Sequence, residues 1–197
     1  MLPQSFIFIG RSGSGKGTQA QLLIEYLESI DPSRKSLYIQ TGALLRDFIE
    51  GPTLTQKVAK DIYDAGGLMP EFTAIYQWVK ALIERYNGNE HLIFDGTPRK
   101  LHEAGVLNSI FSFYKLTKPW VIHIDVTPEE ALKRLMLRKR MDDTEADIKE
   151  RLSWFETEVV PAIDYYKKSS GYTFLSIKGE RSVLDIHADI VQRLALK

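Results

Sequence analysis

GRSGSGKGT occupies residues 10–18, between a short apolar run and an amphipathic one. It places four glycines and one lysine within nine residues. Glycine loses more conformational freedom on folding than any other residue, so such a cluster indicates a local structural requirement. The pattern G-x-x-x-x-G-K between a strand and a helix is typical of a loop whose N–H groups surround phosphate oxygens, with the lysine and the helix N-terminus adding positive charge. The segment predicts a polyphosphate site; the alternative is a glycine-rich turn without a ligand.

Apolar runs and amphipathic runs alternate along the rest of the chain. Near-continuous apolar character favours strands buried on both faces of a parallel sheet, and helical spacing predicts the elements between them. The predicted strands are 5–9, 36–40, 91–94, 120–126 and 172–177, and the predicted helices are 16–29, 71–86, 101–114, 129–137, 142–168 and 182–196. This order predicts one α/β domain over residues 1–197, a doubly wound five-stranded parallel sheet of P-loop NTPase type with helices on both faces.

The segment 42–86 interrupts the alternation, because it holds helical patterns and no strand pattern. We interpret it as a helical insert placed over the sheet. Two local helix starts are also predicted. Residues 127–130, TPEE, form a capping box with proline at the first helical position, and Thr41 is a candidate N-cap for the helix that follows it.

Composition excludes several classes of protein. The 26 basic side chains balance the 26 acidic ones, so the net charge gives no reason to expect nucleic acid or a membrane surface as a partner. The chain contains no cysteine, which excludes disulfides and thiolate metal sites. No apolar run approaches the roughly 20 residues that a membrane helix needs. We expect a cytoplasmic monomer with small-molecule partners.

Four further stretches extend the phosphate-loop pattern: QTGALLR at 40–46, AGGLMP at 65–70, IFDGTPRKLHEA at 93–104 and KRLMLRKRMDDTEADIKERL at 133–152. Together with residues 10–18, and in this order over nearly the whole chain, they resemble the adenylate kinase family of nucleoside monophosphate kinases. The resemblance implies transfer of the γ-phosphoryl group of ATP to a monophosphate, with AMP the first choice, and with Mg²⁺. It also implies that the insert 42–86 is a monophosphate-binding lobe and that residues 138–142 are a rudimentary lid.

The resemblance implies specific roles for individual residues. The donor nucleotide would contact Gly13, Ser14, Gly15, Lys16, Gly17, Thr18, Arg134 and the main chain of Gly179. The acceptor would contact Thr41, Gly42, Arg46, Gly67, Met69, Gly96, Arg99 and Glu103. The catalytic set would be Lys16, Asp95, Arg99, Arg134, Arg138, Arg140 and Arg151, with Asp95 and Thr18 as the magnesium partners.

The residue types fit phosphoryl transfer, which needs positioning and charge stabilisation more than covalent chemistry from the protein. Arginine suits phosphate because its fork is always charged and binds two oxygens at once. Arg134 and Arg138 are four residues apart and therefore share a helix face. Each role has a simpler alternative: a solvated basic helix end for these arginines, a turn cap for Asp95 and a surface position for Arg99. The three tryptophans fit core positions, and the four histidines have no ligand spacing.

Three departures from the family pattern qualify the resemblance. Ser12 replaces a proline, which costs the loop some stiffness. One residue, Lys139, separates Arg138 from Arg140, where the family carries a longer loop. We therefore expect the lid to exclude water poorly and ATP hydrolysis without acceptor to be faster than is usual for the family. A steady-state assay that finds no such hydrolysis would contradict this. Glu103 replaces a glutamine, and a carboxylate only accepts hydrogen bonds, so it suits guanine better than adenine and predicts weaker discrimination for AMP.

Alternative functions stay open at this point. They are a kinase for GMP, CMP or UMP, a phosphate-loop kinase for another small acceptor such as a sugar acid, and a nucleotide-binding sensor that has lost catalysis. The TGALLR and DGTPR stretches disfavour the second, and the full set of charged residues disfavours the third. A GTPase switch is disfavoured because the chain has no N-K-x-D stretch.

Overall fold

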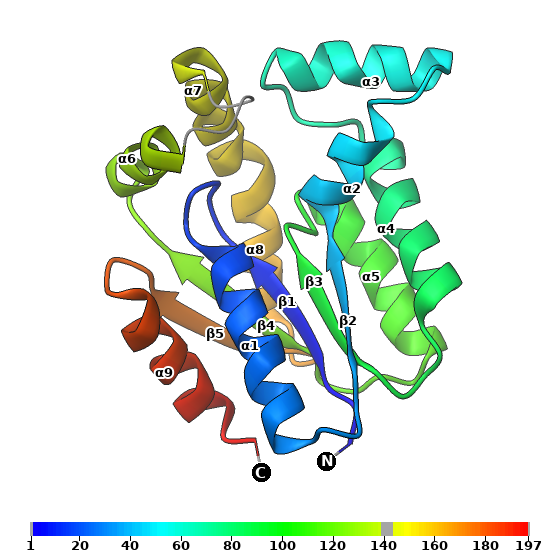
Figure 1. Cartoon of the computed structure of the whole chain (residues 1–197), viewed down its shortest axis with the longest axis vertical. Coiled ribbons are helices and arrows are strands. Elements are labelled where there is room, and N and C mark those ends of the chain that lie inside the picture. Colours follow the sequence, from blue (N-terminus) through cyan, green and yellow to red (C-terminus); the bar gives the residue numbers. More distant parts are fainter. Residues whose placement is uncertain (1, 139–143, 197) are drawn as a thin grey trace.

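The computed structural model describes residues 2–138 and 144–196. Its strands form one parallel sheet in the order β2-β3-β1-β4-β5 (Figure 1). The strand bounds are β1 Ser5–Ile9, β2 Ser36–Gln40, β3 His91–Asp95, β4 Trp120–Asp125 and β5 Thr173–Lys178. The predicted parallel sheet and its five strands are confirmed, each within two residues of its expected ends. This arrangement brings the carboxyl end of β1, where the glycine-rich segment begins, beside that of β3.

Alternation of side chains along the strands divides the core into two layers. Ile7 and Ile9 face one layer, which α4 Glu71–Arg85, α5 Leu101–Phe113 and α8 Val160–Lys168 cover. Phe6 and Phe8 face the other layer, which α1 Lys16–Ile30 and α9 Val183–Leu194 cover. Consecutive residues of a strand face opposite layers, and in β1 both sets are apolar, so both faces of the sheet are buried, as expected for a parallel sheet. Figure 1 shows α1 and α9 side by side in front of the strands.

Three helices separate β2 from β3: α2 Thr41–Phe48, α3 Leu54–Asp64 and α4. They bury a small core of their own, made of Leu45, Ile49, Ala59, Met69 and Ala74. In Figure 1, α3 lies beyond the end of the sheet. A capping box begins α3, in which Thr53 accepts from the N–H of Gln56 and the Gln56 side chain accepts from the N–H of Thr53.

The single helix predicted over residues 142–168 is wrong in one respect, because a π-helical turn divides it. The segments are α7 Glu145–Trp154, the π turn η1 Phe155–Val159 and α8. Pro161, at the start of α8, has no N–H, so the α-helical hydrogen bond to the carbonyl four residues earlier cannot form. A wider turn at this position is consistent with that loss. Residues 139–143 lie outside the described part of the chain.

Two predicted caps differ from the structure. The Thr127 hydroxyl accepts from the N–H of Glu130, as a capping box requires. The Thr127 N–H, however, donates to Glu180 Oε1 at 2.8 Å, while the Glu130 carboxylate pairs with Arg134. Helix α2 begins at Thr41 with Gln40 as its N-cap, so Thr41 is not the cap. Within residues 2–138 and 144–196, no helix is both long enough and apolar enough to cross a membrane.

Candidate functional site

The glycine-rich loop connects β1 to α1 and packs against α6 Pro128–Arg138. A Cβ at Gly13 would lie 2.7 Å from the carbonyl oxygen of Ala131, so only glycine fits there. Gly15 caps α1 with φ 94°, in the left-handed region that side chains disfavour. The two glycines allow the loop to close over the N-terminus of α1, where N–H groups point away from the helix.

Lys16 lies at the centre of this loop. Its Nζ donates to the carbonyl oxygens of Gly10 at 2.8 Å and Arg11 at 2.6 Å. Burial lowers the pKa of Lys16 to about 8; the carboxylate of Asp95 opposes this shift, and Arg99 and Arg138 add to it. An anion beside this ammonium group would favour its charged form. The loop therefore holds a cation that gains from a phosphate ligand.

Asp95 ends β3 and faces the start of α1. Its Oδ2 accepts from the Tyr38 hydroxyl at 2.7 Å and from Gln40 Nε2 at 3.0 Å. Burial and the nearby carboxylate raise the pKa of Tyr38, so the phenol stays a donor. A Cβ at Gly17 would lie 3.3 Å from Asp95 Oδ2, so the absence of a side chain at Gly17 allows the carboxylate to lie close to the loop.

This single carboxylate fits Mg²⁺ held jointly with phosphates. Mg²⁺ in nucleotide sites is usually bound by one or two carboxylates, substrate phosphates and water. The part of the chain that the structure describes contains no group of three or more potential ligands among His, Cys, Asp and Glu. Thr18, the other predicted magnesium partner, is exposed on the first turn of α1.

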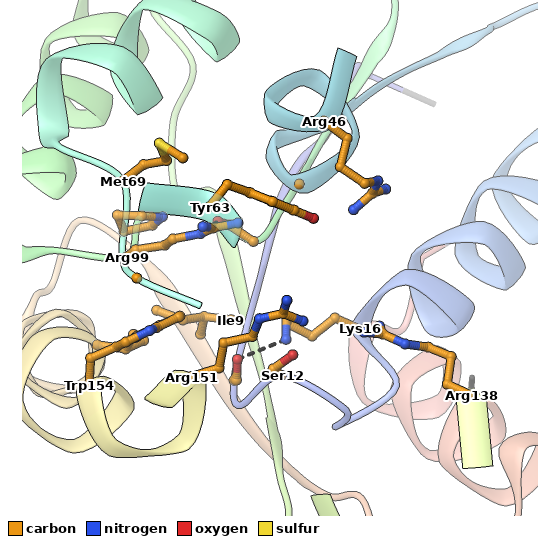
Figure 2. A pocket seen from close by; sticks show the side chains of 16 residues that line it. Ile9, Ser12, Lys16, Arg46, Tyr63, Met69, Arg99, Arg138, Arg151 and Trp154 are labelled. Atoms are coloured by element: carbon orange, nitrogen blue, oxygen red, sulfur yellow. Dashed lines mark hydrogen bonds between the residues drawn. The ribbon is translucent and has the colours of Figure 1, made fainter. Parts of the chain in front are cut away.

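Two adjoining cavities meet at Lys16. The larger, about 840 Å³, is lined by the whole loop from Ser12 to Thr18, by Asp95, Arg134 and Arg138, and by the start of α9. The smaller, about 160 Å³, is lined by Gly67, Met69, Arg151 and Trp154 among others. Residues common to both are Ser12, Lys16, Gly42, Arg46, Gly96, Arg99 and Arg138. Figure 2 shows Arg46, Tyr63, Met69 and Arg99 on one side of the smaller cavity and Lys16, Arg138, Arg151 and Trp154 on the other.

Two guanidinium groups converge at Gly42, the second residue of α2. Arg46 Nη1 and Arg99 Nη2 lie 3.5 and 3.8 Å from the position of a Cβ at Gly42. Arg99 is held in place by its Nε, which donates to Gly96 O at 3.0 Å. Burial lowers the pKa of Arg99, and the carboxylates of Glu103 and Asp95 oppose that shift. Paired arginines without a bound anion repel each other, so the arrangement suits a phosphate group.

Three predicted contact residues line neither of these two cavities. Glu103 is 1% exposed, and its Oε2 accepts from the Thr97 hydroxyl at 2.9 Å and the Arg99 N–H at 3.0 Å. Thr41 is fully buried, and its Oγ1 has no hydrogen-bond partner among the described residues. Gly179 donates its N–H to Asp125 O at 2.7 Å.

The remaining predicted arginines come from α6 and α7. Arg134 donates to Glu130, to the carbonyl oxygen of Gly179 at 2.7 Å and to that of Ser14 at 3.4 Å, so it joins the loop to the end of β5. Arg138 ends α6 and lines both cavities. Arg151 lies 6.0 Å from the centroid of the Tyr63 ring. Arg140 lies outside the described residues.

Sequence reasoning missed several residues of the site. Tyr63, at the end of α3, lines the smaller cavity, and no motif signals it. Trp154, expected in the core, lines the same cavity and donates to Gly66 O at 3.4 Å. Tyr38 and Gln40, which hydrogen-bond to Asp95, lie on β2. The sequence could have indicated them, because ligand sites lie at the carboxyl ends of the strands in open parallel sheets.

Comparisons with known proteins agree with this geometry. The sequence model of the family described as adenylate kinase matches residues 8–171. The chain is similar to an adenylate kinase of Prochlorococcus marinus strain MIT 9301, with 33% identity over 194 residues that cover 98% of this chain and 100% of that protein. An adenylate kinase of Corynebacterium urealyticum is 35% identical over 91% of this chain and 93% of its own length. Adenylate kinase 1 of Nostoc sp. strain PCC 7120 is 33% identical over 89% of this chain and 90% of its own length.

Proposed function

The chain belongs to the adenylate kinase family, and from this premise we propose how its residues transfer the γ-phosphoryl group of ATP to AMP, giving two molecules of ADP. The observation that carries the proposal is the meeting of two cavities at Lys16, with arginines from four segments around the junction. A site for two phosphate chains end to end needs this arrangement of positive charge.

The larger cavity takes ATP. The N–H groups of Gly13, Ser14, Gly15 and Gly17 and the side chain of Lys16 bind its phosphates. Thr18 and Arg134 line the same cavity, and the carbonyl oxygen of Gly179 holds Arg134 in place. The cavity volume of about 840 Å³ supports this assignment, because it is within the usual range for sites that enclose a small ligand.

The smaller cavity and the insert take AMP. Arg46 and Arg99 bind its phosphate over Gly42, where their guanidinium groups already converge. The acceptor base and ribose lie among Gly67, Met69 and Gly96, with Thr41 and Glu103 behind them. Gly67, Met69 and Gly96 line this cavity, which supports their place beside the acceptor.

The reaction is a direct in-line transfer. A phosphate oxygen of AMP attacks the γ-phosphorus, the bond from that phosphorus to the β–γ bridging oxygen breaks, and ADP leaves with that oxygen. Lys16, Arg138 and Arg151 stabilise the charge that spreads over the transferred group, together with Arg99, Arg134 and Arg140. Asp95 would hold Mg²⁺, with Thr18 beside it, and the ion would supply positive charge next to the phosphates. No side chain forms a covalent intermediate.

The test supplies the purified chain with ATP, Mg²⁺ and each of AMP, GMP, CMP and UMP, and follows ADP directly. AMP is expected to react fastest, and Lys16→Ala is expected to lose about a thousandfold in kcat with an unchanged circular dichroism spectrum. ADP binding without turnover of any monophosphate would favour the sensor function instead. Wild-type turnover in Lys16→Ala would refute the role of the lysine. An overwhelming AMP preference in both the wild type and Glu103→Gln would remove Glu103 from base selection.

A further inference from the structure

Arg11, the second residue of the phosphate loop, extends its side chain away from the loop toward η1. Its Nε donates to Val126 O at 3.1 Å, and its Nη2 pairs with Glu156 Oε1 at 2.5 Å. The guanidinium carbon lies 4.2 Å from the centroid of the Phe155 ring, within cation–π range. The side chain is only 14% exposed. Two hydrogen-bonding contacts and one ring contact therefore fix this guanidinium against the π turn.

The main chain of the same residue holds the phosphate-binding lysine. The carbonyl oxygen of Arg11 accepts from Lys16 Nζ at 2.6 Å and from the N–H of Ser14 at 3.1 Å. A phosphate bound in the loop competes for the same ammonium hydrogens. ATP binding therefore alters a contact made by Arg11, and a ligand shifts a conformational equilibrium only through such differential contacts.

The π turn reaches the acceptor side of the site from its other end. Trp154 immediately precedes it, lines the smaller cavity and donates to Gly66 O of the insert. Arg151 lies one turn earlier on α7, beside Tyr63. Glu158 within the turn lies 3.7 Å from Lys100, the neighbour of Arg99. The π turn thus contacts the donor loop through Phe155 and Glu156 and the acceptor side through Glu158, while Arg151 and Trp154 of the preceding helix make two further contacts on that side.

We propose that Arg11 is a positioning residue that couples ATP binding in the loop to AMP binding in the insert, through η1. The proposal rests on the function proposed above. The carboxylate of Glu156 is 56% exposed, and an ion pair of that kind contributes little to global stability. The contacts of Arg11 instead fix where α7 lies relative to the loop. Lys16 and Arg151 then line the same cavity, where the phosphates of the two nucleotides would meet.

Calorimetry tests the coupling without turnover. The Kd of AMP is measured with and without a saturating ATP analogue whose β–γ bridge is an imido group. In the wild type the analogue is expected to tighten AMP binding by about tenfold, within the usual range for coupled sites. In Arg11→Gln this factor is expected to fall to about twofold or less, while the Kd of the analogue alone changes by less than about threefold. Wild-type binding without coupling, or full coupling in Arg11→Gln, would overturn the proposal.

Further variants separate coupling from loss of structure. Glu156→Gln keeps the shape of its side chain and is expected to weaken the coupling in the same direction. The double variant is expected to be no weaker than Arg11→Gln alone, because two residues that act through one contact are not additive. Arg193→Gln is the matched control: it removes an exposed guanidinium that donates to Ser176 O, far from η1, and retains full coupling. Additive losses in the double variant would contradict the link through Glu156. Failure of AMP to react in the wild type would contradict the proposed function. The binding measurements do not require turnover and would still show whether Arg11 couples the two sites.

Discussion

Binding of ATP is expected to be accompanied by proton uptake at Lys16 in mildly alkaline solution. Burial lowers the pKa of the free lysine to about 8, and a polyphosphate beside the ammonium raises it again. Half of the unliganded protein is then neutral at this position at pH 8. Binding takes up about 0.5 proton at pH 8, about 0.9 at pH 9 and about 0.1 at pH 7, if the bound lysine is fully protonated.

Isothermal titration calorimetry measures this uptake directly. ATP is titrated without Mg²⁺ at each pH in two buffers of different ionisation enthalpy, and the difference between the observed enthalpies gives the number of protons. Lys16→Arg is the control, because a guanidinium stays charged throughout this range and takes up no proton. The same enthalpy in both buffers at pH 8 and pH 9 would refute the reasoning. An equal uptake in Lys16→Arg would assign the proton to another group.

Two further predictions concern stability. Gly179→Ala would place its Cβ 2.6 Å from Val126 Cγ1 and 2.7 Å from Ile124 Cγ2. Urea denaturation should therefore show a loss of about 1–3 kcal/mol in unfolding free energy. Gly105→Ala is the control, because a Cβ there meets open space within α5, and its unfolding free energy should rise by about 0.5–1 kcal/mol. Burial raises the pKa of Glu103 above its unfolded value, so its stabilising contribution is complete below the unfolded pKa and is lost as pH rises through the folded pKa. Glu103→Gln keeps an oxygen that can accept from Thr97 and Arg99, and its side chain does not ionise. The unfolding free energy of this variant, relative to that of the wild type, should therefore be larger at about pH 7 than at about pH 4. The same difference at both pH values would contradict this.

Most of the fold was predictable because its signals are local. The strands are short apolar runs bounded by turns, and a sheet buried on both faces needs such runs. The π turn was not predictable in the same way. Residues 155–159 have ordinary helical composition, and the one local signal is Pro161, which follows the turn and lacks the N–H of a regular helix. Caps were also uncertain, because Thr127 has two carboxylate partners within reach and only the folded chain selects Glu180.

The candidate site was predictable where a motif fixes the backbone and less so where packing decides. The positions of Lys16 and Asp95 in the site could be predicted, because Lys16 belongs to the loop motif and Asp95 comes at the end of a predicted strand. Tyr63 and Trp154 reach the smaller cavity only because the insert and α7 fold toward each other. Arg11 stands at a variable position of the loop pattern, and nothing in the sequence relates it to a segment more than 140 residues away. The direction of its side chain is a tertiary property.

The order of the strands has a consequence for how the protein is organised. In the proposed assignment, the ATP-binding parts lie on β1 and on the β4–β5 side of it, whereas most of the AMP-binding parts follow β2 and β3 on the other side. The central strand is thus a boundary between two separable recognition tasks. If the insert 42–86 holds the acceptor as proposed, changes within it would alter which monophosphate fits and would leave the triphosphate loop unchanged. The acceptor preference of such a chain would then be able to change while ATP remains the donor.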